Sequence, residues 1–335
     1  DSSGAHDPLQ ARQRPPEHRR LTVFPPLPPP FRRYQHRWWL HILLFLLTVA
    51  TTTAIGLEHY ASFASDFGTR TALPAGDNAG FGAALALFWR AYGLQALAYS
   101  ASVLAILGAH EMGHYLACRR YDVDATLPYF LPFVSLSGTM GAVIKIREAF
   151  PTRAALFDIA IAGPIGGFVV LVPLLFVGMH FSNVIPVPSD MQGYSLGEPL
   201  LFRVATWLQF GPIAHGYSVN IHPIVFAAWF GMLATAWNLL PFGQLDGGHL
   251  TYATLGDRSR FFSLATVAGA VVMCFISYSW IVMTVMMLAM LYFLGPRHPR
   301  VLSEHEPLGP GRYLLFAFAV LMFILCFTPT PIDPL

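Results

Sequence analysis

Long apolar runs separated by short polar segments make up the chain from residue 38 onward. Such a run needs about 20 residues to cross the ~30 Å hydrocarbon core of a bilayer. The run over residues 261–294 is too long for one span, and Ser277-Tyr278-Ser279 interrupts it, so we divide it into two short helices. The pattern therefore predicts an all-α, polytopic membrane protein with about seven transmembrane helices. The expected spans are Trp38–Leu57, Leu94–Ala117, Ala154–Met179, His222–Leu240, Phe261–Ile276, Trp280–Leu294 and Arg312–Phe327.

Three stretches between these runs are more than linkers. Phe81–Arg90 is short and apolar enough to lie on the membrane surface, and Pro199–Phe210 has the apolar spacing of an interfacial helix. Tyr121–Arg153 is mostly apolar but contains prolines and glycines, and Gly138–Arg147 within it has strand-like character. Because hydrocarbon penalises the free edges of a sheet, we expect a small hairpin that re-enters the protein interior from the inner side.

The N-terminal 37 residues differ from the rest of the chain. They contain several proline pairs and seven arginines, with almost no apolar periodicity. Such a segment buries too little apolar surface to offset its ordering entropy. We therefore expect a disordered, Pro/Arg-rich cytoplasmic tail over residues 1–37, followed by a membrane domain over residues 38–335.

The positions of Lys and Arg favour the seven-span topology. With the N-terminus inside, 17 of the 20 basic residues lie on the inner side, whereas a single span over residues 261–294 would leave only 14 there. Membrane proteins carry their excess of Lys and Arg on the cytoplasmic side. The 19 arginines and single lysine fit a GC-rich bacterial genome. These features place the chain in a bacterial cytoplasmic membrane, with its N-terminus and the opening of its site on the cytoplasmic side.

Composition excludes an ordinary soluble protein. Hydrophobic residues make up 55% of the chain and charged residues 11%, where globular proteins have about 25% charged residues. The net charge of +2 gives no polyanion-binding character, so we expect the lipid bilayer and no nucleic acid among the partners. The three cysteines are an odd number in apolar surroundings and do not indicate a disulfide framework.

The strongest chemical signal is the segment His110-Glu111-Met112-Gly113-His114, near the inner end of the second span. Histidines at positions i and i+4 share one face of a helix and can bind one metal ion. The intervening glutamate is offset by about 100°, close enough to act on water at the metal without being a ligand. The alternative is an interfacial cluster of polar residues that meet lipid headgroups. Ionisable groups deep in a bilayer are costly, which favours a functional site.

Two histidines do not complete a catalytic zinc site, which usually has three protein ligands. The segment from Asn238 to Gly248 lies at the inner end of the fourth span, level with His114, and Asp246 is its best candidate ligand. We expect its proline and three glycines to break the helix and bring the carboxylate to the metal. The alternatives are a glycine turn with a solvated aspartate, and His249 as a competing ligand.

These motifs resemble those of the site-2 proteases, which are intramembrane zinc metalloproteases with HExxH on one core helix and NxxPxxxxDG on another. Asn238, Pro241, Asp246 and Gly247 fit the second motif, and Phe157–Pro164 is similar to the family's middle core helix. The likeness covers roughly residues 94–248, with C-terminal helices over residues 261–328. It is greatest to the branch of the chloroplast ethylene-dependent gravitropism-deficient and yellow-green proteins and their bacterial relatives. The stretch between residues 181 and 221 is too short for the PDZ domain of other branches.

The resemblance implies a three-helix catalytic core that holds one zinc ion per chain. His110, His114 and Asp246 would bind the ion, Glu111 would be the general base, and Asn238 would hold the substrate backbone or the developing oxyanion. The re-entrant hairpin would pair with a transmembrane protein or peptide substrate. Its substrate-binding residues would be Gly138, Thr139, Met140, Gly141, Ala142, Val143 and Ile144.

The implied activity is hydrolysis of a peptide bond within or near a transmembrane segment, by zinc-activated water with Glu111 as the base. Two other functions use the same ligands: a metal-ion transporter, and an inactive pseudoprotease that only binds membrane proteins. The concentration of ionisable groups at one depth disfavours a transport relay. The intact Glu111 and Asp246 disfavour the pseudoprotease. The sequence specifies neither the substrate nor the oligomeric state.

Overall fold

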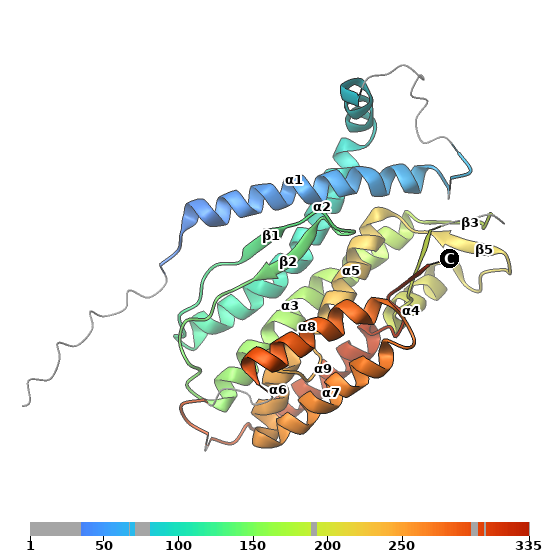
Figure 1. The fold of residues 1–335 in the computed structure, drawn as a ribbon. Coiled ribbons are helices and arrows are strands. Elements are labelled where there is room, and N and C mark those ends of the chain that lie inside the picture. The colour runs from blue at the N-terminus through green and yellow to red at the C-terminus, as the bar shows by residue number, and fades with distance from the viewer. Residues whose placement is uncertain are drawn as a thin grey trace, which may run out of the picture. The chain divides into compact units, whose positions relative to one another are not determined.

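The computed structural model describes residues 35–66, 68–70, 81–188, 193–295, 301–304 and 306–334. The predicted N-terminal tail lies outside the described residues up to residue 34. Most of the described chain is helical, as predicted (Figure 1). The helices are α1 (Trp38–Ala64), α2 (Phe81–Arg120), α3 (Arg153–His180), α4 (Leu200–Phe210), α5 (Pro223–Asn238), α6 (Asp246–Leu255), α7 (Ser259–Met273), α8 (Ser279–Leu294) and α9 (Pro310–Cys326), with a 3₁₀ turn at Gly256–Arg258.

Three of the described helices are long and apolar enough to cross a membrane. They are α1, the part of α2 from Ala86 to Arg120, and α3. The helices α4, α5, α8 and α9 are apolar but have only 10–17 residues each. A membrane protein built from helices is therefore supported, while the number of seven spans stays a prediction.

The sequence predicted some helix boundaries better than others. The run over residues 261–294 is divided as expected, because α7 ends at Met273 and α8 begins at Ser279. The stretch Phe81–Arg90 is not a separate element, because α2 continues through it; its position on the membrane surface stays a prediction. No proline lies between residues 81 and 120 to end the helix, and Gly93 alone does not end it.

The predicted hairpin consists of β1 (Tyr129–Pro132) and β2 (Thr139–Val143), which pair antiparallel. Strand β2 begins one residue after the start of the predicted strand-like stretch Gly138–Arg147 and ends four residues before its end. Pairing shifts between Leu131 and Pro132, so Met140 is an extra residue that bulges outward and is 67% exposed.

Helix α1 lies along the hairpin from its base to its tip (Figure 1). At the base, the ring of His41 stacks on Tyr129 with 4.0 Å between ring centroids. At the tip, the ring nitrogen Nε2 of His59 lies 2.9 Å from the carbonyl oxygen of Leu136. The two histidines are 18 residues apart on α1, which is about 27 Å along a helix axis.

Two further small sheets were not expected from the sequence. Strand β3 (Asn183–Pro186) pairs with β5 (Tyr217–Asn220), and β4 (Tyr194–Leu196) pairs with β6 (Ile332–Pro334). The strands have three or four residues each, too few for the period-two pattern to be recognised.

Helices α2 and α3 approach each other closely, and α5 packs against both. Glycines make this approach possible: a Cβ atom on Gly113 of α2 would overlap the backbone carbonyl of Ala162 on α3. Large side chains fill the space where the helices diverge, and Tyr99, Leu171, Trp229 and Met232 are all at most 2% exposed. This packing holds one face of α2 against α3 and α5, and His110 and His114 lie near that contact.

Candidate metal centre

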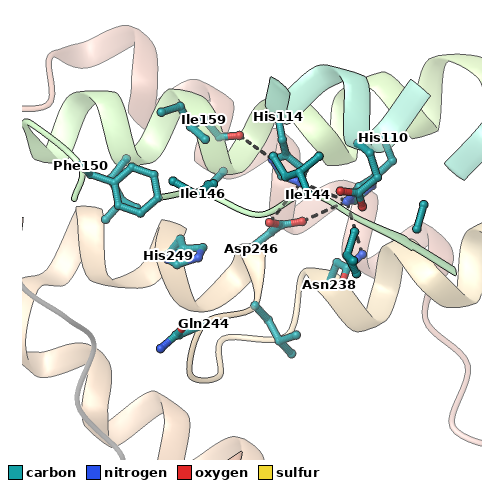
Figure 2. A pocket seen from close by; sticks show the side chains of 16 residues that line it. His110, His114, Ile144, Ile146, Phe150, Ile159, Asn238, Gln244, Asp246 and His249 are labelled. Atoms are coloured by element: carbon teal, nitrogen blue, oxygen red, sulfur yellow. Dashed lines mark hydrogen bonds and ion pairs between the residues drawn. The ribbon is translucent and has the colours of Figure 1, made fainter. Parts of the chain in front are cut away.

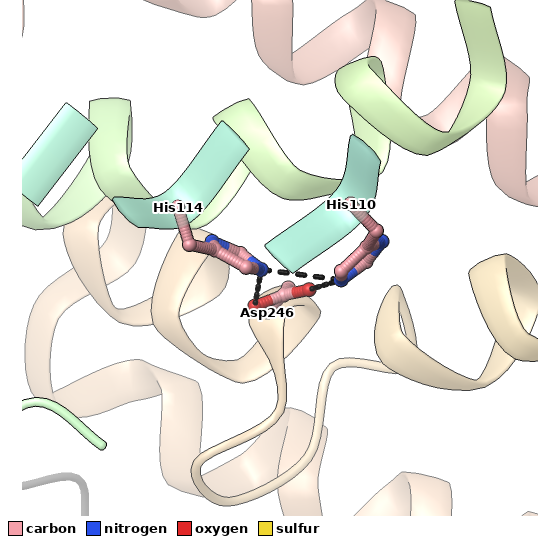
Figure 3. A group of neighbouring side chains, drawn as sticks. All are labelled: His110, His114 and Asp246. Atoms are coloured by element: carbon pink, nitrogen blue, oxygen red, sulfur yellow. Dashed lines mark hydrogen bonds and ion pairs between the residues drawn. The ribbon is translucent and has the colours of Figure 1, made fainter. Parts of the chain in front are cut away.

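His110 and His114 lie one helical turn apart on α2, so their imidazoles point the same way (Figure 3). Each residue is 7% exposed, and Glu111 between them is 8% exposed. Buried ionisable groups require partners or a ligand. The burial of three ionisable side chains within five residues therefore indicates a functional site.

The turn between α5 and α6 brings Asp246 to the two histidines. Helix α5 ends at Asn238, the chain turns through residues 239–245, and Asp246 is the first residue of α6. The turn is so tight that a Cβ atom on Gly247 would overlap the carbonyl oxygen of Leu239. The expectation that Gly247 and Gly248 break the helix is therefore wrong, because both lie in the first turn of α6 and allow the backbone to pass there.

The three side chains converge on one point (Figure 3). The Nε2 atoms of His110 and His114 are 3.1 Å apart. They lie 3.2 Å and 3.3 Å from the two carboxylate oxygens of Asp246. Ligand atoms bound tetrahedrally at 2.0–2.1 Å are about 3.3 Å apart. The spacing and the donor types therefore suit a zinc ion, and the described part of the chain holds no other such group of three His, Cys, Asp or Glu residues.

Helix α3 fixes the orientation of the His114 ring. Its Nδ1 atom lies 2.7 Å from the carbonyl oxygen of Ile159, and a carbonyl only accepts, so Nδ1 carries the proton. Nε2 consequently presents a lone pair toward Asp246 and His110. Gly163 lies against the same ring, and a Cβ atom there would overlap it. This arrangement, a histidine ligand oriented through its other nitrogen, is typical of metal sites.

Glu111 lies beside the three ligands and is not one of them. The backbone N–H of Ile144, just after β2, faces the carboxylate of Glu111. On the other side, Asn238 Nδ2 lies 3.4 Å from His110 Nε2. The site therefore has a positioned carboxylate and an amide donor next to the candidate ligands.

A cavity of about 240 Å³ opens along these residues (Figure 2). It is lined by all five candidate residues from α2, α5 and α6, together with Ala142, Val143 and Ile144 of the predicted substrate-binding segment. The other predicted substrate-binding residues, Gly138, Thr139, Met140 and Gly141, do not line it. Gly138 instead lies at the hairpin tip, where a Cβ atom would overlap the backbone of Thr52 on α1.

The cavity also includes His249, which the sequence offered as a competing ligand, and several residues that the sequence did not single out. His249 lines the cavity but does not belong to the ligand group. Its position three residues after Asp246 on one helix was the signal for it. Phe150, Ile159 and Gln244 also line the cavity. Ile159 and Gln244 lie within the stretches that carry the family resemblance but had no role assigned to them, and nothing in the linear pattern points to Phe150.

An ion pair joins α9 to α3 at Asp158, the residue before Ile159. The guanidinium of Arg312 donates to both carboxylate oxygens of Asp158, at 2.8 Å and 2.7 Å. The hydroxyl of Tyr121 donates to the same carboxylate. Burial, together with the adjacent Asp158, raises the pKa of this hydroxyl, so it keeps its proton. Asp158 thus holds the ends of α2 and α9 to α3 and takes no part in the cavity.

Comparisons with known proteins agree with this arrangement of residues. The sequence profile of peptidase family M50 matches residues 98–280. The chain is 36% identical over 179 residues to a protein of Arabidopsis thaliana named probable zinc metalloprotease EGY1, chloroplastic. It is 32% identical over 246 residues to a protein of Oryza sativa subsp. indica named probable zinc metalloprotease EGY2, chloroplastic. No solved structure matches the chain.

These matches cover part of each protein. The Arabidopsis match includes 51% of this chain and 32% of the relative, and the rice match includes 69% and 42%. The chain therefore spans less than half the length of these curated relatives.

Proposed function

The chain belongs to peptidase family M50, and on that premise we propose that it is an intramembrane zinc metalloprotease. It hydrolyses a peptide bond within or near a transmembrane segment of a membrane-protein substrate. The observation that carries the proposal is the convergence of His110, His114 and Asp246 on one point with Glu111 beside them. A glutamate next to a bound ion serves hydrolysis, whereas transport gives it no task.

Each residue has a distinct part in the proposed reaction. His110, His114 and Asp246 would hold a zinc ion, which would supply a Lewis acid to polarise the carbonyl and acidify water. Glu111 takes a proton as the water oxygen attacks the carbonyl carbon, and it returns this proton to the amine nitrogen as the C–N bond breaks. The amide of Asn238 donates to the substrate backbone or to the oxyanion.

A helical substrate has to unwind before it is cut. The peptide groups of a helix are hydrogen-bonded to one another and shielded by the surrounding side chains. The scissile carbonyl therefore becomes accessible to Glu111 only in an extended segment.

The edge of β2 supports a site for such a strand. The N–H of Ile144 points away from β1 and toward Glu111, while the N–H of Lys145 donates to Thr126 on the opposite side. Outward and inward groups alternate along a strand, so the backbone of Ala142 also faces outward. A substrate strand added at this edge replaces the hydrogen bonds lost on unwinding.

This strand pairing predicts an alternating effect of backbone methylation. Replacing single N–H groups of a peptide substrate by N-methyl groups should slow cleavage about tenfold at every second residue near the cut. The residues between them, whose N–H groups point away from β2, should be affected much less. Measuring kcat/KM for each methylated peptide checks this, and an effect without alternation would contradict the pairing.

Contacts between loops support seven crossings in one bilayer. These contacts fall into two groups, one at each end of the long helices α1, α2 and α3. An odd number of crossings puts the first and last residues on opposite sides of the membrane, and alternate loops then meet on the same side. Chemical labelling of single cysteines in each loop, from each side of the membrane, measures the topology. One group joins Gln35 to Arg147, Thr152 to Ser303 and Arg153 to Ala253; the other joins Asn220 to Asp66, His222 to Ser182, Gly197 to Pro331 and Ser277 to Asp333.

We place this protein in a bacterial cytoplasmic membrane, with the cavity opening toward the cytoplasm. The supporting feature is the excess of arginine in the loops of the first contact group, which includes Arg147 and Arg153. The same labelling experiment tests this orientation.

A zinc assay combined with cleavage of a model transmembrane peptide tests the proposed function. The purified protein should contain about one zinc per chain and cut the peptide, and a chelator should stop cleavage until zinc is restored. Metal flux into vesicles without cleavage would indicate a transporter. Binding of the peptide with neither flux nor cleavage would indicate a pseudoprotease.

A further inference from the structure

The cavity continues past the candidate metal ligands on the side away from Asn238 (Figure 2). The chain that follows β2 runs along it, with Ile144 level with the ligands and Ile146 and Phe150 beyond them. His249 of α6 faces Ile146 and Phe150 across this end. The cavity therefore has two unlike ends: one at Asn238, and one that we call the Phe150 end.

The Phe150 end is built mainly from apolar side chains. Leu156 and Ile159 of α3 form one wall and are at most 2% exposed, so packing holds them in place. The rings of Phe150 and His249 form a corner, with centroids 5.8 Å apart and planes at 63°. An edge-to-face corner of this kind packs well around a further flat or branched apolar group.

We propose that the Phe150 end is a subsite for one large apolar side chain, aromatic or leucine-like, on the substrate residue adjacent to the cleaved bond. The proposal rests on the proposed function, because Glu111 and the ligands set the position of the cut. A strand that runs along Ile144 places the residue two positions further on beside Ile146, within reach of Phe150. The cleaved bond then lies between these two residues, next to the one beside Ile146. The subsite then selects the cleavage position within a transmembrane segment.

The proposal predicts a clear preference in the parent protein. Peptides with Phe or Leu at the residue on one side of the cut should be cleaved with kcat/KM about tenfold or more above peptides with Ala there. Asp at the same position should be worse than Ala, because the walls formed by Phe150, Leu156 and Ile159 are apolar and removing a carboxylate from water there costs free energy. The residue on the other side of the cut should show a smaller preference.

Substitution of Phe150 should change this preference in opposite directions. Phe150→Ala enlarges the subsite, so peptides with Trp should gain relative to peptides with Phe. Phe150→Trp narrows it, so peptides with Ala should gain. Phe316→Ala is the matched control, because Phe316 is partly buried in the same apolar cluster as Phe150 and does not line the cavity. The control should keep the preference of the parent.

Binding gives a second measurement that needs no cleavage. In the full-length Glu111→Gln protein, peptides with Phe should bind about tenfold tighter than peptides with Ala, and the added Phe150→Ala should remove most of this difference. Cleavage without any preference, or equal shifts in Phe150→Ala and Phe316→Ala, would overturn the subsite and leave the protease intact. If the zinc-loaded parent cut no peptide, the proposed function would fail, and equal binding of the two peptides would then overturn the subsite as well.

Discussion

The Glu111→Gln variant is expected to lose cleavage and keep its zinc. Removing a general base typically lowers the rate about a hundredfold to ten-thousandfold. Glutamine has the shape of glutamate, and its side-chain oxygen can still face the N–H of Ile144. The three candidate ligands are unchanged. Metal analysis should therefore find the zinc content of the parent, while kcat/KM with a transmembrane peptide falls.

The matched control for this variant is Glu306→Gln. Glu306 is exposed and does not line the cavity, so its loss of charge should leave both zinc content and cleavage unchanged. Full cleavage by the zinc-loaded Glu111→Gln protein would remove Glu111 from the mechanism. A chelator-sensitive activity would then need another base, and His249 is the next ionisable group along the cavity.

The helices could be predicted from the sequence because their signal is local. A run of apolar residues can be recognised from its own sequence, without knowing which segments pack against it. The predicted run from Ala154 to Met179 differs from α3 by one residue at each end. The interruption at Ser277-Tyr278-Ser279 could be recognised for the same reason. The continuation of α2 through Phe81–Arg90 was missed, because polar and small residues around Gly93 weaken the apolar signal without ending the helix.

The candidate ligands could be predicted in part because their spacing has a geometric meaning. Two histidines four residues apart share a helix face in any fold, so His110 and His114 needed no tertiary information. Asp246 is 132 positions from His114, and only the expected depth of its span connected the two. The contact itself depends on the turn between α5 and α6, which local patterns did not describe correctly.

The walls of the cavity could not be predicted because they depend on contacts between remote segments. Ile159 orients His114 through a backbone carbonyl, which every residue type has. Phe150 reaches the cavity from a loop, and its type is common throughout the chain. The small sheets β3–β5 and β4–β6 also form between strands that are remote in the sequence. These features depend on how remote segments pack against each other, and the local sequence of each segment carries no signal for them.

The Asp246→Asn variant is expected to lose most of its zinc affinity, by at least about a hundredfold. Asp246 is the only negatively charged group among the three candidate ligands, and asparagine replaces it with a neutral amide of the same size. Zinc at a hundred times its dissociation constant stabilises the folded parent by about 2.7 kcal/mol. That stabilisation should be nearly absent in the variant, and cleavage should fall with the zinc content. Thermal unfolding with and without zinc, together with metal analysis, checks both effects.

Asp257→Asn, at an exposed residue two residues beyond α6, should behave as the parent does. An Asp246→Asn protein that retained full zinc affinity would show that the carboxylate is not a ligand, and the metal centre would have to include another residue of the cavity.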